Sequence, residues 1–194
     1  MSIGNVGPGA IGLKVWTEPS SDTPFKVGDR VIIRFKADRD CHVLAANVSP
    51  KGDVAIIFPN VDHPDSLARA NKEYTLHGTN SKLKLVFGKG ISEARLVFYV
   101  SPDAVDLQPF KMTESQGIVL IPSSEQEKLG LLRAKIEQIS RLAGFNRHVV
   151  SLQVDPKKPA GFRLMGLPTK PVSTGPGNVT GTRGRAEDPQ ELGK

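Results

Sequence analysis

The chain has 194 residues, of which 38% are hydrophobic, and a formal net charge of +6. This length allows one domain with a core of its own, and the low hydrophobic content indicates that part of the chain does not pack into it. No stretch approaches the roughly 18 consecutive apolar residues of a membrane-spanning helix, so we expect no membrane span. Most of the positive charge falls after residue 155; the folded part is therefore nearly neutral, and we expect no nucleic-acid partner.

The first half of the chain predicts short strands at residues 11–17, 30–37, 41–48 and 54–58. In the segment 30–37 apolar and charged residues largely alternate, which places one apolar row on a core and one charged row in water. The turn between the third and fourth strands is predicted from Pro50 and Gly52. Proline presets the backbone at the second position of a turn, and glycine accepts a positive φ near its end.

Further strands are predicted at residues 73–77, 82–87, 94–100 and 148–154, with an irregular insertion at 102–122. An amphipathic helix is predicted at about residues 125–143. Its start is indicated by the sequence Ser124 to Glu127, which matches a capping box, and its apolar stripe includes Leu132 and Ile139.

These elements predict a mainly β fold: an antiparallel β-sandwich, immunoglobulin-like or a partly open barrel, with one packed amphipathic helix. Residues 1–10 are expected to form a flexible leader and residues 11–155 the β-sandwich domain. The segment 156–194 is rich in proline, glycine and basic residues and has a single aromatic residue, so we expect a disordered tail.

No set of residues predicts catalysis or a cofactor. The four histidines lie apart, no serine stands in a nucleophile elbow, and the glycine clusters do not match a phosphate-binding loop. Asp62, His63 and Asp65 are weak candidates for a metal site because carboxylates and imidazole bind divalent cations. Their spacing matches no metal motif, and such loops are common as turns. We expect neither catalytic residues nor a bound metal or cofactor.

The aromatic residues Trp16, Tyr74 and Tyr99 are candidates for a binding surface, since exposed aromatic rings can stack on sugars. Cys41 is the only cysteine, and it lies within a predicted apolar strand. We therefore expect a small buried side chain there rather than a reactive thiol.

Several short motifs resemble the bacterial domain-of-unknown-function 4384 family. They include a strand start at Val27-Gly28-Asp29, a turn before Cys41, and a strand that ends in Phe58-Pro59-Asn60. The resemblance extends over roughly residues 11–155. It implies an all-β domain of the bacterial cell envelope and carries no known activity. From the residues themselves, Gly28 and Asp29 favour a turn into a strand, and Pro59 ends a strand because proline cannot donate to the ladder.

The sequence thus favours a noncatalytic binding or scaffolding module of the bacterial cell envelope, with an unknown protein or glycan as its partner. One alternative is a glycan or cell-wall binder, and another is a metal-dependent hydrolase that uses the loop 62–65. The resemblance implies a periplasmic or secreted protein. A cytoplasmic location stays open, since no signal peptide is visible at the start of the sequence.

Overall fold

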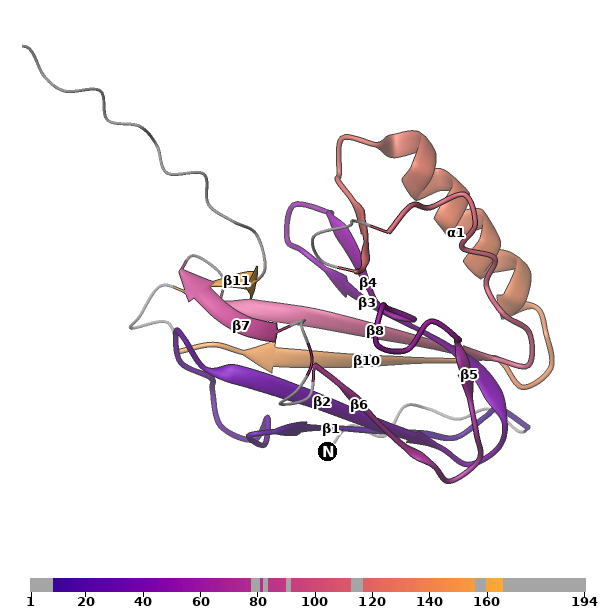
Figure 1. Ribbon diagram of the computed structural model, residues 1–194, viewed down its shortest axis with the longest axis horizontal. Helices are drawn as coiled ribbons and strands as arrows, with labels where there is room; N and C mark the ends of the chain where they lie inside the picture. The colour runs from indigo at the N-terminus through magenta and orange to yellow at the C-terminus, as the bar shows by residue number, and fades with distance from the viewer. Residues whose placement is uncertain are drawn as a thin grey trace, which may run out of the picture.

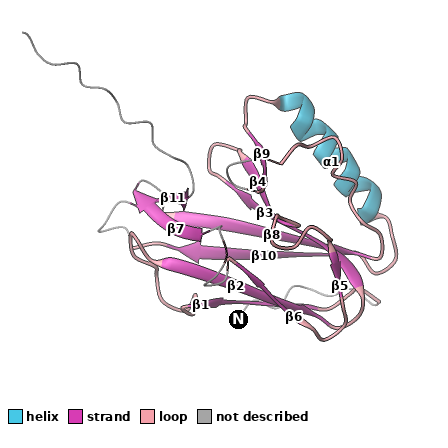
Figure 2. Ribbon diagram, in the orientation of Figure 1, coloured by secondary structure: helices cyan, strands magenta, loops and turns pink. Residues whose placement is uncertain are grey.

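The computed structural model describes residues 9–77, 81, 84–89, 92–112, 117–155 and 160–165. They form two antiparallel sheets with a hydrophobic core between them, and one helix lies on the outer side of the second sheet (Figures 1 and 2). The prediction of a mainly antiparallel β-sandwich with one packed helix is confirmed, and the described strands form two sheets that do not close into a barrel.

The first sheet has the strand order β1-β2-β7-β11, and a further strand, β6, also pairs with β2. Its strands are β1 (Leu13–Glu18), β2 (Arg30–Ala37), β6 (Glu73–Leu76), β7 (Lys84–Lys89) and β11 (Ala160–Met165). One side of β2 is shared between two strands. Arg30 and Val31 pair with β7, and the stretch from Ile33 to Lys36 pairs with β6.

The second sheet has the order β10-β8-β3-β4-β9, and the short strand β5 pairs with β3. Its strands are β3 (Cys41–Val48), β4 (Val54–Phe58), β5 (Leu67–Ala68), β8 (Glu93–Ser101), β9 (Val119–Ile121) and β10 (Asn146–Gln153). The strands β1 and β10 are therefore edge strands, one in each sheet.

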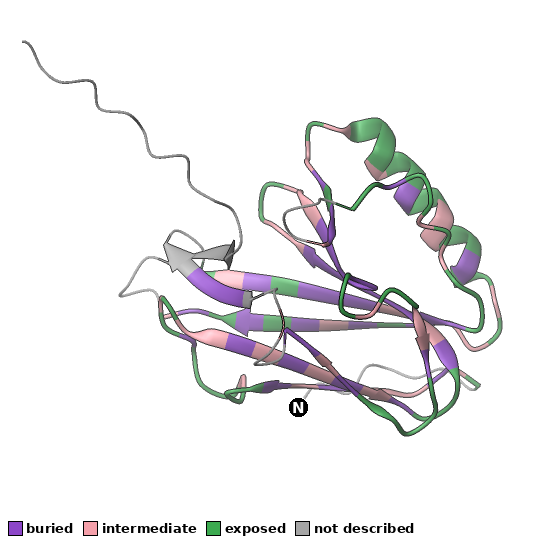
Figure 3. Ribbon diagram, in the orientation of Figure 1, coloured by how far each residue is buried: buried purple, intermediate pink, exposed green. Residues whose placement is uncertain are grey.

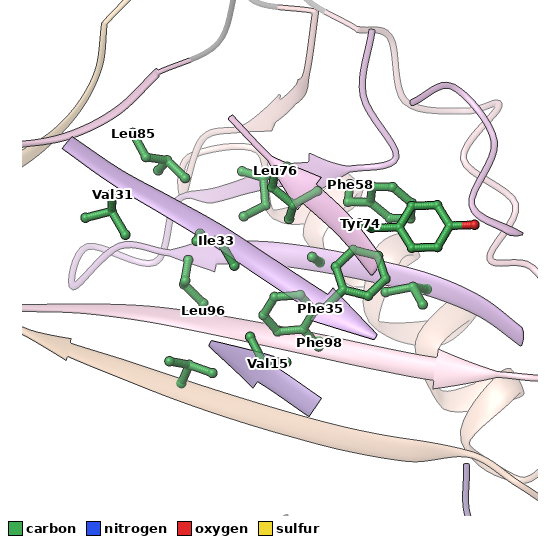
Figure 4. Close-up of a cluster of buried hydrophobic side chains, with 14 of the residues drawn as sticks. Val15, Val31, Ile33, Phe35, Phe58, Tyr74, Leu76, Leu85, Leu96 and Phe98 are labelled. Carbon is green, nitrogen blue, oxygen red and sulfur yellow. The ribbon is translucent and has the colours of Figure 1, made fainter. Parts of the chain in front are cut away.

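The core between the sheets follows from the alternation of the strands. In β2 the residues Val31, Ile33, Phe35 and Ala37 are buried, and the residues between them are half-exposed. Phe35 stacks on Tyr74 with ring centroids 5.1 Å apart and meets the edge of Phe58 at 5.2 Å (Figure 4). The period-two pattern in the sequence thus sets which face of the first sheet is buried.

The helix α1 (Gln126–Ser140) covers a second, smaller apolar cluster on the outer face of the second sheet. Its buried residues are Leu132 and Ile139, which are two turns apart, and the outer side of the helix is exposed (Figure 3). The strand β3 is buried on both faces, because Val43 faces the first cluster and Leu44 faces the second.

The helix begins and ends differently from the prediction. The residue before its first turn is Glu125, which makes no side-chain capping hydrogen bond, and Ser124 is exposed, so the predicted capping box is wrong. Instead, the side-chain amide of Gln126 donates a hydrogen bond back to the carbonyl of Ser123. The helix ends at Ser140 rather than near residue 143, and Gly144 follows with a φ of +96°.

Three strands, β2, β3 and β4, begin and end at the predicted residues. The strands β5 and β11 were not predicted, and β9 lies in the stretch predicted to be irregular. β11 lies within the segment 156–194 and pairs with β7. The leader residues 1–8 and the tail residues 166–194 lie outside the described residues, so the flexible leader and the disordered tail stay predictions.

Candidate functional site

The Val27-Gly28-Asp29 motif forms the turn just before β2, and this turn is hydrogen-bonded to β7. Gly28 has a φ of +88°, and the Asp29 carboxylate accepts a hydrogen bond of 2.7 Å from the backbone amide of Lys26. The turn is fixed to the sheet because the Gly28 amide donates to the carbonyl of Phe87 at 2.7 Å. Val27 packs against the core from a partly buried position. Each group of this motif thus serves the fold.

The Phe58-Pro59-Asn60 motif organises the loop that follows β4. Asn60 is buried, and its side-chain amide donates to the carbonyl of Ile57 at 2.7 Å. Its side-chain oxygen accepts the backbone amides of Asp62 and His63, both at 2.9 Å. The side chain of one asparagine therefore forms hydrogen bonds with three backbone groups at the end of the strand.

The metal candidates Asp62, His63 and Asp65 point to different partners in this loop. Asp62 accepts a hydrogen bond from the hydroxyl of Ser81, and Asp65 accepts the backbone amide of Leu67 at 2.8 Å. The ring of His63 lies near the ring of Phe58, with centroids 5.9 Å apart. Among the described residues no group of three histidine, cysteine or acidic side chains is placed to hold a metal ion.

The three aromatic candidates lie in three separate places. Tyr74 is buried in the main core, and its hydroxyl accepts the backbone amide of Arg69 at 3.0 Å. Tyr99 belongs to the cluster beneath α1, where its ring stacks with that of Phe145. Trp16 lies on β1 and is half-exposed, with the ammonium group of Lys14 5.4 Å above its ring. Of the three, Trp16 lines an open groove.

Two further polar sites, at His42 and His77, lie elsewhere. The Nδ1 atom of His42 is 2.8 Å from the hydroxyl oxygen of Ser66, and both residues line a cavity of about 10 Å³ under α1. That volume is about that of one water molecule, which is too small for a substrate. His77 is 1% exposed with a φ of +58°, and neither ring nitrogen has a hydrogen-bond partner among the described residues.

Cys41 is buried at the start of β3, as expected, and its surroundings disfavour a thiolate. Burial raises the pKa of its thiol to about 11, and the nearby carboxylates of Asp38 and Asp40 act in the same direction. Asp40 itself accepts the backbone amide of Ala70 at 2.7 Å and the guanidinium of Arg69, and both contacts lower the pKa of its carboxyl group. Asp40 thus joins the start of β3 to the segment at Arg69 and Ala70, and Cys41 beside it stays a thiol at neutral pH.

An open groove of about 610 Å³ lies between the edge strands β1 and β10. It is lined by Lys14, Val15, Trp16, Thr17, Ser20, Ser21, Asp22, Val149, Val150 and Ser151. Val15, Thr17 and Val150 are buried, and the exposed residues Lys14, Ser20, Asp22 and Ser151 are at the rim. Six of its ten lining residues are polar, so the groove combines an apolar floor with a polar rim. Sequence reasoning found only Trp16, because the two strands are far apart in the chain.

Hydrogen bonds close the seam between β1 and β10 at both ends of the groove. At one end the amide of Ile11 donates to the carbonyl of Gly144 at 2.9 Å, and the side chain of Asn146 donates to the carbonyl of Ile11 at 2.9 Å. At the other end the amide of Phe25 donates to the carbonyl of Gln153, and the amide of Asp155 to the carbonyl of Phe25, both at 2.8 Å. The groove is thus an interruption in a seam that is otherwise joined.

Arg34, which lies next to Trp16 across β1 and β2, is already engaged on the outer face of the first sheet. Its guanidinium donates to the carboxylates of Glu73 and Glu18, and these hydrogen bonds raise its pKa. Glu18 is therefore occupied by Arg34. No helix among the described residues is long and apolar enough to cross a membrane.

Residues 24–104 match the model of a family described as a domain of unknown function (DUF4384). The match confirms the resemblance seen in the Val27-Gly28-Asp29 and Phe58-Pro59-Asn60 motifs. It covers the segment from β2 to β8 and leaves out β1, β9, α1, β10 and β11. The comparisons found no match among curated proteins and none among solved structures.

Proposed function

We propose that this chain, which matches the domain of unknown function 4384 over residues 24–104, is a noncatalytic binding module whose site is the groove between β1 and β10. The observation that carries the proposal is a groove of about 610 Å³ between two edge strands, with the half-exposed ring of Trp16 at its side. A groove of this size is large enough for several residues of a peptide or for a short sugar chain.

The lining of the groove favours binding over catalysis. It holds a single carboxylate, that of Asp22, which accepts a hydrogen bond from the hydroxyl of Ser20. Neither a histidine nor a second carboxylate is among the lining residues, and general acid–base catalysis works through such groups within hydrogen-bond reach of the substrate. The alternative of a hydrolase at Asp62, His63 and Asp65 has no support from the loop, where the two carboxylates hold other groups.

We place the module in the bacterial cell envelope, in the periplasm or outside the cell. The support for this location is the family resemblance. Fractionation of the source cell tests the location directly. Recovery of the protein with the cytoplasmic fraction would contradict it.

A second candidate function is glycan binding in the same groove, and Trp16 is the observation that favours it. An indole ring beside the hydroxyl groups of Ser20, Ser21 and Ser151 offers a stacking surface with hydrogen-bonding partners around it. The two candidates use one site and differ in the chemistry of the ligand.

The binding proposal is tested by blocking the groove. The full chain, immobilised, is exposed to envelope and cytoplasmic fractions of the source cell as wild type and as Ser151→Trp, whose indole would fill the groove beside Val149. The matched control is Ser124→Trp, which places the same side chain on the exposed loop before α1. We expect wild type and control to retain the same component and Ser151→Trp to lose it. Equal retention by all three, or no retention by wild type, would contradict the proposal.

A further inference from the structure

The backbone of β1 presents unpaired groups toward the groove. In an antiparallel pair, alternate residues direct their amide and carbonyl groups to the partner strand, and the residues between them direct theirs away. The carbonyl of Gly12 accepts the amide of Asp38 beside β2, whereas the amide of Ile11 points the other way and donates to Gly144. Continued along the strand, this alternation directs the backbone groups of Leu13, Val15 and Thr17 toward β10.

The backbone of β10 presents the same kind of edge from the opposite side. The carbonyl of Gln153 points away from β8 and accepts the amide of Phe25, and the next amide, of Val154, donates to Ser92 in line with the β8 ladder. The alternation therefore directs the backbone groups of Val149 and Ser151 into the groove. The strands β1 and β10, which both lie entirely within the described residues, share no backbone hydrogen bond.

The two edges also run in the same direction. Ile11, before β1, is bonded to Gly144, before β10, and Phe25, after β1, is bonded to the end of β10 at Gln153. The open stretch of β1 is therefore about five residues long, or about 16 Å of extended chain. A single strand lying in the groove, antiparallel to both edges or parallel to both, would meet alternating donors and acceptors on each side.

The surface around the groove is basic. Lys14 and Lys36 are neighbours across β1 and β2, Arg95 lies opposite Ser151, and Arg147 is on β10. None of these four cations takes part in an ion pair among the described residues. Of the nearby acids, Glu18 is held by Arg34 and Asp22 accepts a hydrogen bond from Ser20. Acidic side chains of an incoming strand would therefore find partners at the rim.

We propose that the groove takes an extended segment of a partner protein, with apolar and acidic residues in alternation, which pairs with the edges of β1 and β10 and joins the two sheets. This proposal rests on the proposed function and names the ligand class for the same groove. The apolar residues of the segment lie over Val15 and Val150, and its acidic residues face Lys14 and Arg147.

The backbone edges distinguish a peptide from the other ligands that a basic, aromatic groove can attract. A peptide strand supplies one donor and one acceptor for each residue, at the spacing of the free groups on β1 and β10. A glycan or a single-stranded nucleic acid has no such regular alternation, and would leave these backbone groups without matched partners. Edge pairing of this kind is a recurrent mode of peptide recognition.

The test is selection from a displayed library of random dodecapeptides on the full-length protein, followed by affinity measurements on synthetic copies of the selected peptides. Ser151→Pro removes an amide that faces the groove and none that bonds to β8, so proline is tolerated there as on other edge strands. Ser151→Ala is the matched control that keeps the amide. Lys14→Glu combined with Arg147→Glu tests the charge.

We expect selected peptides that alternate apolar and acidic residues, bind Ser151→Ala like wild type, and bind Ser151→Pro at least tenfold more weakly. The charge-reversed variant is expected to bind them at least tenfold more weakly as well. If Ser151→Pro does not fold, the same peptides methylated on alternate backbone amides are tested on wild type, and unchanged affinity would overturn the proposal. Absence of selected peptides would also overturn it. The proposed function is judged separately. If no peptide bound but Ser151→Trp still lost the component retained from cell fractions, the groove would be a binding site for another class of ligand.

Discussion

At the scale of single residues, His77 combines burial with the absence of partners. Its ring is 1% exposed and neither nitrogen is hydrogen-bonded among the described residues. Its pKa is lowered to about 4, chiefly by burial; the charge of Asp62 opposes this shift and that of Arg30 adds to it. The folded protein therefore holds this histidine neutral at pH values where the unfolded chain binds a proton.

This difference predicts a loss of stability in mild acid. Since the pKa is lower in the folded state, the contribution of His77 is fully present above about pH 6.5 and falls as the pH drops toward 4. Between pH 7.5 and pH 5 the loss amounts to about 2 kcal/mol of unfolding free energy. Urea unfolding of wild type and His77→Asn at the two pH values checks this, because asparagine accepts the positive φ and does not titrate. The same pH dependence in both proteins would contradict it.

Asn60 is the residue on which the loop after β4 depends most. Asn60→Ala removes three hydrogen bonds at a site that is 1% exposed, and leaves the carbonyl of Ile57 and two backbone amides without this partner. We expect a loss of about 2 to 3 kcal/mol in unfolding free energy. Asp65→Ala, which removes one exposed hydrogen bond in the same loop, serves as the control and should cost less than about 1 kcal/mol. Equal losses for the two variants would contradict the role given to Asn60.

At the scale of elements, the helix α1 is held to the second sheet by few side chains. Leu132 is 5% exposed and packs in the outer cluster, whereas its neighbour Leu131 is 41% exposed. The basic end of Lys135 adds a contact with the carboxylate of Asp106 at 2.7 Å, and this contact lowers the pKa of Asp106. The helix is thus an addition to one face of the sandwich and takes no part in the core between the sheets.

The pair Leu131 and Leu132 tests that arrangement with the same substitution at adjacent positions. Leu132→Ala should destabilise the protein by about 2 to 4 kcal/mol, because it leaves a cavity under the helix. Leu131→Ala should stay within about 0.5 kcal/mol of wild type, since its side chain is largely in water. Thermal and urea unfolding of both variants measure the difference. A large loss for Leu131→Ala would show that the helix lies on the sheet by another face.

The elements that the sequence predicts well are those whose signals are local. The strands β2, β3 and β4 are bounded by turn residues such as Pro50 and Gly52, so their limits can be read from the chain itself. The two-residue strand β5 exists because Cys41 and His42 lie beside it, which no local pattern reveals. At the start of α1 the capping-box sequence gave a wrong prediction, since Ser124 is exposed and the helix has no side-chain capping hydrogen bond.

At the scale of the whole molecule, the groove could not be predicted from the sequence. It depends on which strands lie at the edges of the two sheets, and this order is set by pairings between distant segments. Trp16 was named as a candidate from its residue type, and the serines and valines that share the groove with it carried no signal. Tyr74 and Tyr99 are aromatic as well but lie in hydrophobic clusters, so aromatic character alone did not distinguish Trp16 from them.

The segment that matches the family model is predicted not to fold as a separate unit. Residues 24–104 contain β2 and β8 but lack their partners β1 and β10, along with the core residues Val15 and Leu152. We expect this fragment to be unfolded or aggregated, and the segment 9–155 to unfold cooperatively. Circular dichroism and limited proteolysis of the two fragments measure the difference. A cooperative transition in the short fragment would contradict the prediction.

The late position of β10 in the sequence has a consequence for synthesis on the ribosome. β8 lies between β3 and β10, and the hydrogen bonds that hold Ile11 and Phe25 come from the stretch after α1. Until that stretch leaves the exit tunnel, the nascent chain carries one side of β8 as an exposed apolar edge, a form that other chains can pair with. Translation must therefore pass nearly the whole domain before Ile11 and Phe25 find these partners, although β1 can pair with β2 much earlier. We expect the growing chain to need chaperones that bind extended apolar segments.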